Sequence, residues 1–395
     1  MYPEIRLKPE RSISIINRHP WIFSGAIKAI PEGVTNGSIV NITDESGDLV
    51  ATGTYSTHSL IAVRVFDFHR IIIDKGWLKG RIHEAHERRQ LQGLGVDDTT
   101  TGYRVVFGES DWLPGLVVDR YADVLVIQLA TAGMARLRDM IVECLVDLFA
   151  PRSIFERSDL PGRREEGLKA DTGLRYGENP GLVEFREHGL KYLADVASGQ
   201  KTGFYFDQRD LRQEINRLAS GKRTIDLLSY TGAAGTAALA GKASSVHFVD
   251  ASETALQFCR RHVELNELDG GRVTTESADV FQWLAERSSP EYDLVMLDPP
   301  ALIKSRKHIE SGRKGYHFLN RAAIRIIRDG GILVTSSCSA YFPESDLAVT
   351  LRRAAEQTGV RLSLLKIIHQ ASDHPRSLNF PEASYLKSFI CRIER

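Results

Sequence analysis

The pattern of hydrophobic and polar positions in the first 70 residues predicts short β-strands. The stretch GSIVNITDESGDLVATGTYS, residues 37–56, places two β-rich runs around the turn sequence DESGD. The apolar run LIAVRVFDF, residues 60–68, closes the region as a further strand. We therefore expect a small all-β module at the amino-terminal end of the chain.

A mixed pattern follows. The sequence WLKGRIHEAHERRQL, residues 77–91, contains no proline and predicts a helix. One face of this helix carries four residues at helical spacing: Leu78, Ile82, Ala85 and Arg89. Residues 103–130 predict three strands with turns at GESD and DRYAD, and a helix follows near 135–149. Residues 156–173 are polar and rich in charge, which predicts a loop, and 182–196 predict a β-hairpin. The expected domain is α+β.

From about residue 200 onward, apolar strands alternate with helices, which predicts a parallel, doubly wound sheet. The last two predicted strands, 360–368 and 385–394, are separated by a polar loop with two prolines. We interpret them as an antiparallel hairpin at the edge of the sheet. The patterns together divide the chain into three domains: 1–70, 71–198 and 199–395.

Length, charge and cysteine content narrow the class of protein. The 395 residues exceed the usual size of one compact domain. Basic and acidic residues balance at 51 each, so a nucleic-acid partner would need a local basic surface. No two of the four cysteines are spaced like metal ligands, so no metal site is predicted. The charged amino terminus is unlike a signal peptide, and no apolar run approaches the ~18 residues of a membrane span. We expect a cytoplasmic protein without a membrane partner.

Acidic residues mark the carboxyl ends of the predicted parallel strands, where open α/β sheets bind ligands. Four aspartates lie at or just after these ends: Asp226, Asp250, Asp279 and Asp298. In the turn SYTGAAG, Gly232 and Gly235 would let the backbone approach a ligand at a helix amino terminus. Each acid by itself could instead cap the next helix. Four acids in series favour a nucleoside ligand.

The residue types at these strand ends indicate which nucleoside is bound. Asp250 is spaced to hold a ribose diol, and Asp279 can accept a hydrogen bond from an adenine amino group. TGAAGT lacks the third glycine of a dinucleotide-binding turn, and Asp226 would repel a pyrophosphate. S-adenosylmethionine (SAM) has no phosphate and has a cationic end. We therefore favour SAM over NAD.

The sequence LDPP, residues 297–300, is a rigid turn because each proline restricts the residue before it. Methyltransferases that act on exocyclic amino groups usually carry an aromatic residue next, whereas this chain has Ala301. Methylation at carbon 5 of a pyrimidine has a different chemical requirement. Because C5 is a poor nucleophile, a thiolate must add to C6 before C5 can attack a methyl group. Cys338, in GGILVTSSCS, ends the neighbouring strand and is our candidate nucleophile; a packed thiol is the alternative. Asp298 is a candidate for contact with the ring N3 or for proton transfer.

The other cysteines, Cys144, Cys259 and Cys391, fall within predicted helices or the last strand and are interpreted as structural. The connection after the DPP turn is strongly basic, with Glu310 as the single acid of residues 301–328. We predict RNA contact for six of its residues: Lys304, Arg306, Lys307, Arg313, Lys314 and Tyr316. A solvated helix face is the alternative, above all for Arg321, Arg325 and Arg328. Because a base inside a duplex is unreachable, the target would be single-stranded or flipped.

These motifs resemble a family, the bacterial methyltransferases that make 5-methylcytidine in 23S ribosomal RNA. HPWIFSGAI (19–27) and IAVRV (61–65) are similar to its RNA-binding PUA module, and LPGLVVDRYADVLVIQ (113–128) to its central domain. KTGFYFDQRDLR (201–212) and HPRSLNFPEASYLKSF (374–389) resemble motifs of its catalytic part, as do LDPP and GGILVTSSCS.

The resemblance implies an α/β fold: a PUA-like β-barrel, an α+β middle domain and a Rossmann-like class I methyltransferase domain. It implies SAM bound by the four aspartates together with Gln208 and Arg209, and Cys338 as nucleophile. Two rivals remain. One is N-methylation of a guanine or adenine with Cys338 as a bystander, and the other is a non-catalytic RNA-binding assembly factor. The complete series of acids argues against the second. The group that removes the C5 proton is not identified, and a homodimer is left open.

Overall fold

The computed structural model describes residues 2–9 and 13–395, which form two compact units. The first unit comprises three segments: residues up to Gly189, Ala194–Phe206 and Ser372–Ala383. The second unit comprises the other three: Leu190–Leu193, Asp207–Ala371 and Ser384–Arg395. The predicted three-domain division stays a prediction, and residues 1 and 10–12 of its first domain lie outside the described residues.

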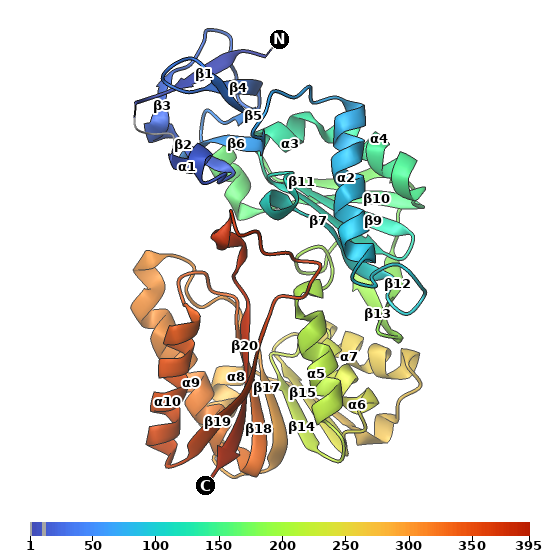
Figure 1. The fold of residues 1–395 in the computed structure, drawn as a ribbon. Helices are drawn as coiled ribbons and strands as arrows, with labels where there is room; N and C mark the ends of the chain where they lie inside the picture. The colour runs from blue at the N-terminus through green and yellow to red at the C-terminus, as the bar shows by residue number, and fades with distance from the viewer. Residues whose placement is uncertain (1, 10–12) are drawn as a thin grey trace. The chain divides into compact units, whose positions relative to one another are not determined.

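The first sheet of the first unit has six strands in the order β2-β6-β5-β4-β1-β3 (Figure 1). Its strands and helices are β1 (Glu4–Leu7), α1 (Ile13–Ile16), β2 (Trp21–Phe23), η1 (Ser24–Ala26), β3 (Ile27–Ala29), β4 (Ile39–Thr43), β5 (Leu49–Tyr55) and β6 (Ile61–Asp67). Its core is aliphatic, with Ile5, Val40 and Val63 fully buried. The short strands predicted for the first 70 residues are therefore present.

The second sheet of this unit has five strands in the order β11-β10-β9-β8-β7. The elements are α2 (Lys75–Gln90), β7 (Gly102–Phe107), η2 (Gly108–Asp111), β8 (Leu116–Tyr121), β9 (Val124–Leu129), α3 (Ala132–Arg136), α4 (Arg138–Phe149), β10 (Ser153–Ser158), η3 (Pro161–Glu166) and β11 (Asp171–Gly177). The predicted face of α2 is the buried one. The predicted hairpin also forms, from β12 (Leu182–Glu187) and β13 (Leu190–Asp195).

The prediction of a loop over residues 156–173 is wrong at both ends. Residues 156–158 belong to β10, and β11 begins at Asp171. One of the charged side chains in this stretch lies in the interior and forms ion pairs there. Glu156 is fully buried and pairs with Arg138 Nε at 2.9 Å and Arg175 Nε at 2.7 Å. A buried strand whose polar residues are paired has no hydrophobic signature, so the pattern of residue types did not reveal it.

The second unit contains a seven-stranded sheet in the order β16-β15-β14-β17-β18-β20-β19, flanked by helices (Figure 1). Its elements are η4 (Phe206–Gln208), α5 (Arg209–Leu218), β14 (Arg223–Leu227), α6 (Ala233–Ala240), β15 (Ser245–Asp250), α7 (Glu253–Leu265), η5 (Gly270–Arg272), β16 (Val273–Ser277), α8 (Val280–Ala285), β17 (Tyr292–Leu297), η6 (Arg306–His308), α9 (Ile309–Arg325), β18 (Ile327–Ser337), α10 (Glu344–Thr358), β19 (Arg361–His369) and β20 (Lys387–Glu394). β14 to β18 pair in parallel, and β20 runs antiparallel to both neighbours. The last two strands are antiparallel as predicted, but β20 is internal and only β19 lies at the edge.

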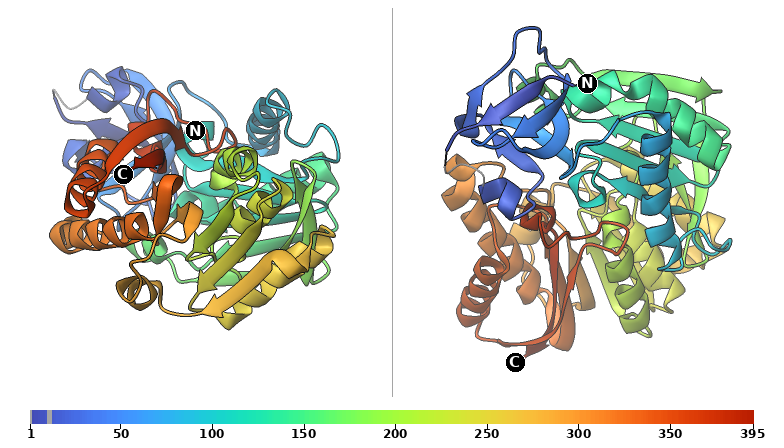
Figure 2. Two further views of the ribbon diagram at one scale, coloured as in Figure 1. Left: turned by 90° about the horizontal axis from the view of Figure 1, so that it is seen from below. Right: turned by 45° about the horizontal axis from the view of Figure 1, so that its top comes forward.

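Both faces of this sheet are covered, which explains why inner strands such as β17 are nearly continuous apolar runs. Along β17, Val295 and Leu297 pack with α8, α9 and α10, whereas Leu294 and Met296 pack with α5, α6 and α7. On the first face, α9 and α10 lie side by side (Figure 2). In such a sheet the carboxyl ends of parallel strands meet at one edge, where ligands bind. Among the described residues, no helix is both long and apolar enough to cross a membrane.

Candidate active site

The turn between β14 and α6 has a strained backbone. Leu228 has φ 60° and Tyr230 has φ 49°, in the left-handed region that non-glycine residues seldom adopt. Hydrogen bonds hold the turn against the end of β15: Leu228 N donates to Val249 O at 2.9 Å, and Tyr230 N donates to Asp250 Oδ2 at 2.8 Å. Strain of this kind costs roughly 1–3 kcal/mol per residue and is typical of ligand sites.

The two glycines of this turn also have a packing role that the sequence did not reveal. Gly232 has φ 73° and precedes α6, and a Cβ there would lie 2.6 Å from Cys259 Sγ. A Cβ on Gly235 would lie 2.2 Å from Cε1 of Phe248. Both α-carbons therefore face the interior between α6, α7 and β15. Close packing of α6 on the sheet requires these glycines, and contact of their backbone with SAM stays a prediction.

Asp226, on β14, is a buried carboxyl group with 5% of its surface exposed. Its Oδ2 accepts a hydrogen bond from Gly235 N at 2.8 Å, which anchors the first turn of α6. Burial, together with the negative charges of Asp298 and Asp250, raises the pKa of Asp226 to about 8 against the lowering effect of that hydrogen bond. Three carboxyl groups from neighbouring strands thus lie within electrostatic range of one another.

Asp250 and Asp279 follow the next two strands of the sheet. Asp250 is half-buried, and its Oδ1 accepts from Ser252 N at 2.9 Å while Oδ2 holds the strained turn. Asp279 is exposed and caps α8, since its Oδ1 accepts from Gln282 N at 3.0 Å. The capping geometry weighed as the alternative is therefore real for Asp279. The predicted contacts of both residues with SAM stay predictions.

Asp298 and Gln208, predicted from separate motifs, meet in the structure. Gln208 Nε2 donates to Asp298 Oδ2 at 2.6 Å, which ties the start of α5 to the DPP turn after β17. Arg209 begins α5 and is buried with 1% of its surface exposed. Carboxylates that converge at one edge of a sheet suit a ligand with a ribose diol and cationic groups. The residues present therefore fit SAM.

The segment that carries Cys338 is held by hydrogen bonds on both sides of that residue. Tyr316 of α9 lies at the centre: its hydroxyl accepts from Ser337 Oγ at 2.9 Å and lies 2.9 Å from Ser339 Oγ. Ser339 Oγ also accepts from Ile303 N at 3.2 Å. Cys338 itself is half-buried at the carboxyl end of β18. The neighbouring serines thus fix the backbone beside the candidate nucleophile.

The prediction that Tyr316 contacts RNA is wrong. Its ring is fully buried and stacks on Phe342 with centroids 4.5 Å apart, so no base can reach it. The reason is that the stretch 304–317 becomes helical at Ile309, which turns Tyr316 toward the sheet. Gly312 is required by the same packing, because a Cβ there would lie 2.3 Å from Ile303 Cγ1.

The remaining cysteines, Cys144, Cys259 and Cys391, are buried, in agreement with their structural interpretation. Burial raises the pKa of the Cys391 thiol to about 12, and it also raises the pKa of Cys144 and Cys259. Cys338 is the single cysteine with partial exposure among the four, all of which lie in the described part of the chain.

Sequence reasoning missed Lys387, the first residue of β20. Only 6% of its surface is exposed, and its Nζ donates to Ser339 O at 2.7 Å and to Tyr385 O at 3.1 Å. A lysine at the start of the apolar run LKSFICRI was the available signal, because lysine is rarely buried without a function or a partner.

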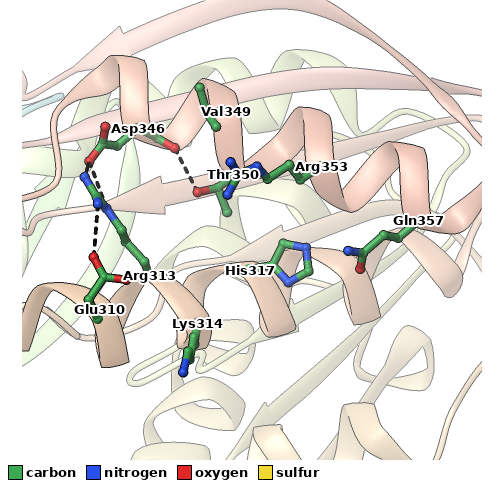
Figure 3. Close-up of a pocket in the computed structure, with 9 residues that line it drawn as sticks. All are labelled: Glu310, Arg313, Lys314, His317, Asp346, Val349, Thr350, Arg353 and Gln357. Atoms are coloured by element: carbon green, nitrogen blue, oxygen red, sulfur yellow. Dashed lines mark hydrogen bonds and ion pairs between the residues drawn. The ribbon is translucent and has the colours of Figure 1, made fainter.

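The basic residues after the DPP turn differ in their surroundings. Lys304, Arg306 and Lys307 are exposed, and none of them forms an ion pair with another described residue. Arg313 instead pairs with Asp346 and lies 3.3 Å from Glu310. Arg313 and Lys314 line a polar pocket of about 520 Å³ between α9 and α10 (Figure 3). RNA contact stays a prediction for these five residues.

Comparison with known proteins agrees with this geometry. A family model described as a PUA-like domain matches residues 5–68, and one described as an S-adenosylmethionine-dependent methyltransferase matches residues 171–376. Ribosomal RNA large subunit methyltransferase I of Yersinia pseudotuberculosis serotype O:1b (strain IP 31758) is 38% identical over 387 residues, 97% of each chain. The chain belongs to the ribosomal RNA large subunit methyltransferase I family. The protein of that name from Yersinia pestis bv. Antiqua (strain Angola) is 37% identical over the same shares.

Membership in this family confirms the predicted fold class and SAM as the cofactor. Two solved structures agree on the fold at 21% identity, covering 99% of this chain and 100% of theirs. One, SMU.776, is named as a methyltransferase complexed with SAH and has a TM-score of 0.85. The other is named as a SAM-dependent methyltransferase from Streptococcus mutans and has a TM-score of 0.83. At this identity they show the fold alone.

Proposed function

We propose that this protein transfers a methyl group from SAM to carbon 5 of a cytosine in large-subunit ribosomal RNA. The substrate class rests on the name of relatives that share 37–38% identity over nearly the whole chain. The choice of carbon 5 as the methylated atom depends mainly on one observation. The half-buried Cys338 directly follows β18, which pairs with β17, and Asp298 directly follows β17, while the other three cysteines are buried. Ribosomal RNA as substrate also implies action in the cytoplasm.

Cys338 acts as the nucleophile in this proposal. Its thiolate forms a bond to C6 of the cytosine, and the electron pair of the C5–C6 double bond moves to C5. SAM, when bound, would supply an electrophilic methyl group for C5, with its S–CH3 bond broken and S-adenosylhomocysteine as the leaving group. Loss of the C5 proton to a base then restores the double bond and expels Cys338 as a thiolate, so that the enzyme is unchanged.

Asp298 lies at the end of β17 with Gln208 donating to its Oδ2, so its carboxylate is held at the same edge of the sheet. We assign it contact with the ring N3 or proton transfer. Gln208, Arg209, Asp226, Asp250 and Asp279 would form the surroundings of SAM, with Gly232 and Gly235 shaping the turn. The serines and Tyr316 hold the nucleophile in position and have no direct part in the chemistry.

RNA binding is assigned to exposed cations and to the PUA-like module. Lys304, Arg306 and Lys307 directly follow the DPP turn, so a phosphate backbone bound there would run past the mouth of the site. The target cytosine would be single-stranded or flipped, because C6 must be open to the thiolate.

The deciding experiment is Cys338→Ala, assayed on ribosomal RNA from cells that lack this gene. Methyl transfer should fall by about a thousandfold or more, as for other nucleophile deletions, while SAM affinity stays unchanged. Nucleoside mass spectrometry of the wild-type product should give 5-methylcytidine. Normal turnover in the variant would refute the role of Cys338, and a methylated guanine or adenine would favour the N-methylation alternative.

A further inference from the structure

Lys387 is the most unusual charged group near the site. Its ammonium is buried, yet within the described part of the chain no carboxylate forms an ion pair with it. Isolated buried cations are costly, so an uncompensated one indicates that a negative charge is present in some working state of the protein.

The backbone places this ammonium beside the candidate nucleophile. Lys387 is the register partner of Ser337, the residue before Cys338, and its Nζ donates to the carbonyl oxygen of Ser339, the residue after it. A side-chain hydrogen bond of 2.7 Å between Ser336 Oγ and Ser388 Oγ adds a second link between the strands. Lys387 is therefore linked to the residues on both sides of Cys338.

The electrostatics agree with this geometry. Burial lowers the pKa of Lys387 to about 8, and the negative charges of Cys338 and Glu344 act in the opposite direction. Lys387 thus remains largely protonated at pH 7. The titratable groups that act on it are Cys338 and Glu344 of α10. His369 of β19 is its register partner on the other side and lies 2.9 Å from Glu344.

We propose that Lys387 is a positioning residue whose buried ammonium stabilises the thiolate of Cys338 and fixes its segment through the carbonyl oxygen of Ser339. The thiolate would be a counter-charge of this lysine in addition to the charge of Glu344. The inference rests on the proposed function where it takes Cys338 as the nucleophile. The interaction between the two side chains, however, can be measured without any RNA.

The test is the pH dependence of alkylation of Cys338 by iodoacetamide, followed by mass spectrometry of its peptide in the full chain. Compared with wild type, Lys387→Met and Lys387→Gln should lower the rate at pH 7.0 by about tenfold and move the midpoint of the pH profile upward. Lys387→Arg, which keeps the charge, should retain most of the wild-type rate at pH 7.0. Lys366→Met is the matched control. Lys366 lies on the neighbouring strand β19 and pairs with Glu214 of α5, so this variant should leave the alkylation profile of Cys338 unchanged.

An unchanged pH midpoint in both uncharged variants would overturn the proposal, even if alkylation became uniformly slower. A loss of reactivity in Lys387→Arg as large as in Lys387→Met would also overturn it, because charge would then not matter. SAM binding by each variant verifies that the second unit is folded. If Cys338→Ala retained methyl transfer, the proposed function would fail while the alkylation profile still decided the role of Lys387.

Discussion

At the scale of single residues, the charge state of Asp226 makes stability depend on pH. This carboxyl is buried beside Asp250 and Asp298, which raises its pKa to about 8. An ordinary aspartate in the unfolded chain titrates near pH 4. Between these values the folded protein holds a proton that the unfolded chain has lost, so the stability contributed by this group falls as the pH rises.

Asp226→Asn should remove this pH dependence. Without ligand, we expect the variant to be more stable than wild type at pH 8.5 by at least about 1 kcal/mol, because it no longer buries a charge. At pH 5 the advantage should be clearly smaller, since Asp226 is protonated in the folded state and only about one pH unit separates this pH from the pKa of the unfolded aspartate. Thermal unfolding at both pH values measures the difference. Asp269→Asn, at an exposed cap, is the control, and an equal effect at both pH values would contradict the prediction.

Asp250 carries two tasks at the same edge of the sheet. It holds the strained turn through Tyr230 N, and it is the predicted ligand of the SAM ribose. Asp250→Ala should weaken SAM binding by about tenfold to a hundredfold, the usual loss when a charged hydrogen-bonding group is removed. Isothermal titration calorimetry provides the test. Unaltered affinity would remove the ribose assignment and leave Asp250 a purely structural residue.

At the scale of secondary-structure elements, the contact of α6 with β15 depends on Gly235. Gly235→Ala would place a Cβ 2.2 Å from the buried ring of Phe248. We expect a net loss of about 1–3 kcal/mol from overpacking, despite the better helix propensity of alanine. Gly80→Ala in α2 is the matched control, since nothing lies within 4 Å of its Cβ position. That variant should be stabilised by up to about 1 kcal/mol. Thermal unfolding measures both changes in stability. If the two variants were both stabilised or both destabilised, this account would be refuted.

Element types were predicted well wherever a hydrophobic period was present. The helix at α2 and the alternation of β14 to β18 with helices follow from local pattern, because each element buries one face or both. The prediction failed over residues 156–158, where Glu156 gives a buried strand a polar sequence. It also failed for Tyr316, because a glycine-containing basic stretch proved to be a helix with an inward face.

At the scale of the whole molecule, the net charge is zero, so RNA binding depends on where the cations lie. Reversing the charge of Lys304, Arg306 and Lys307 to glutamate should weaken RNA binding and reduce the slope of log affinity against log salt. The slope should fall by about 0.7–0.9 for each phosphate that a cation no longer neutralises. Filter binding over a salt series measures this slope. The control variant replaces Arg325 and Arg328, which are also exposed, with glutamate. If the variant of Lys304, Arg306 and Lys307 had the same slope as wild type, these three cations would face solvent and not RNA.

Local patterns in the amino-acid sequence predicted the order of elements, the doubly wound sheet, the strand-end aspartates and the candidate thiol. These features are local, since period, turn chemistry and residue type at a strand end are all readable over a few positions. Which distant residues became partners followed from the three-dimensional fold. It inserted β20 between β18 and β19, which brought the ammonium of Lys387 beside the segment of Cys338. It turned Tyr316 inward to hold the flanking serines and joined Gln208 to Asp298. Such pairings depend on strand order and burial, which no local pattern encodes.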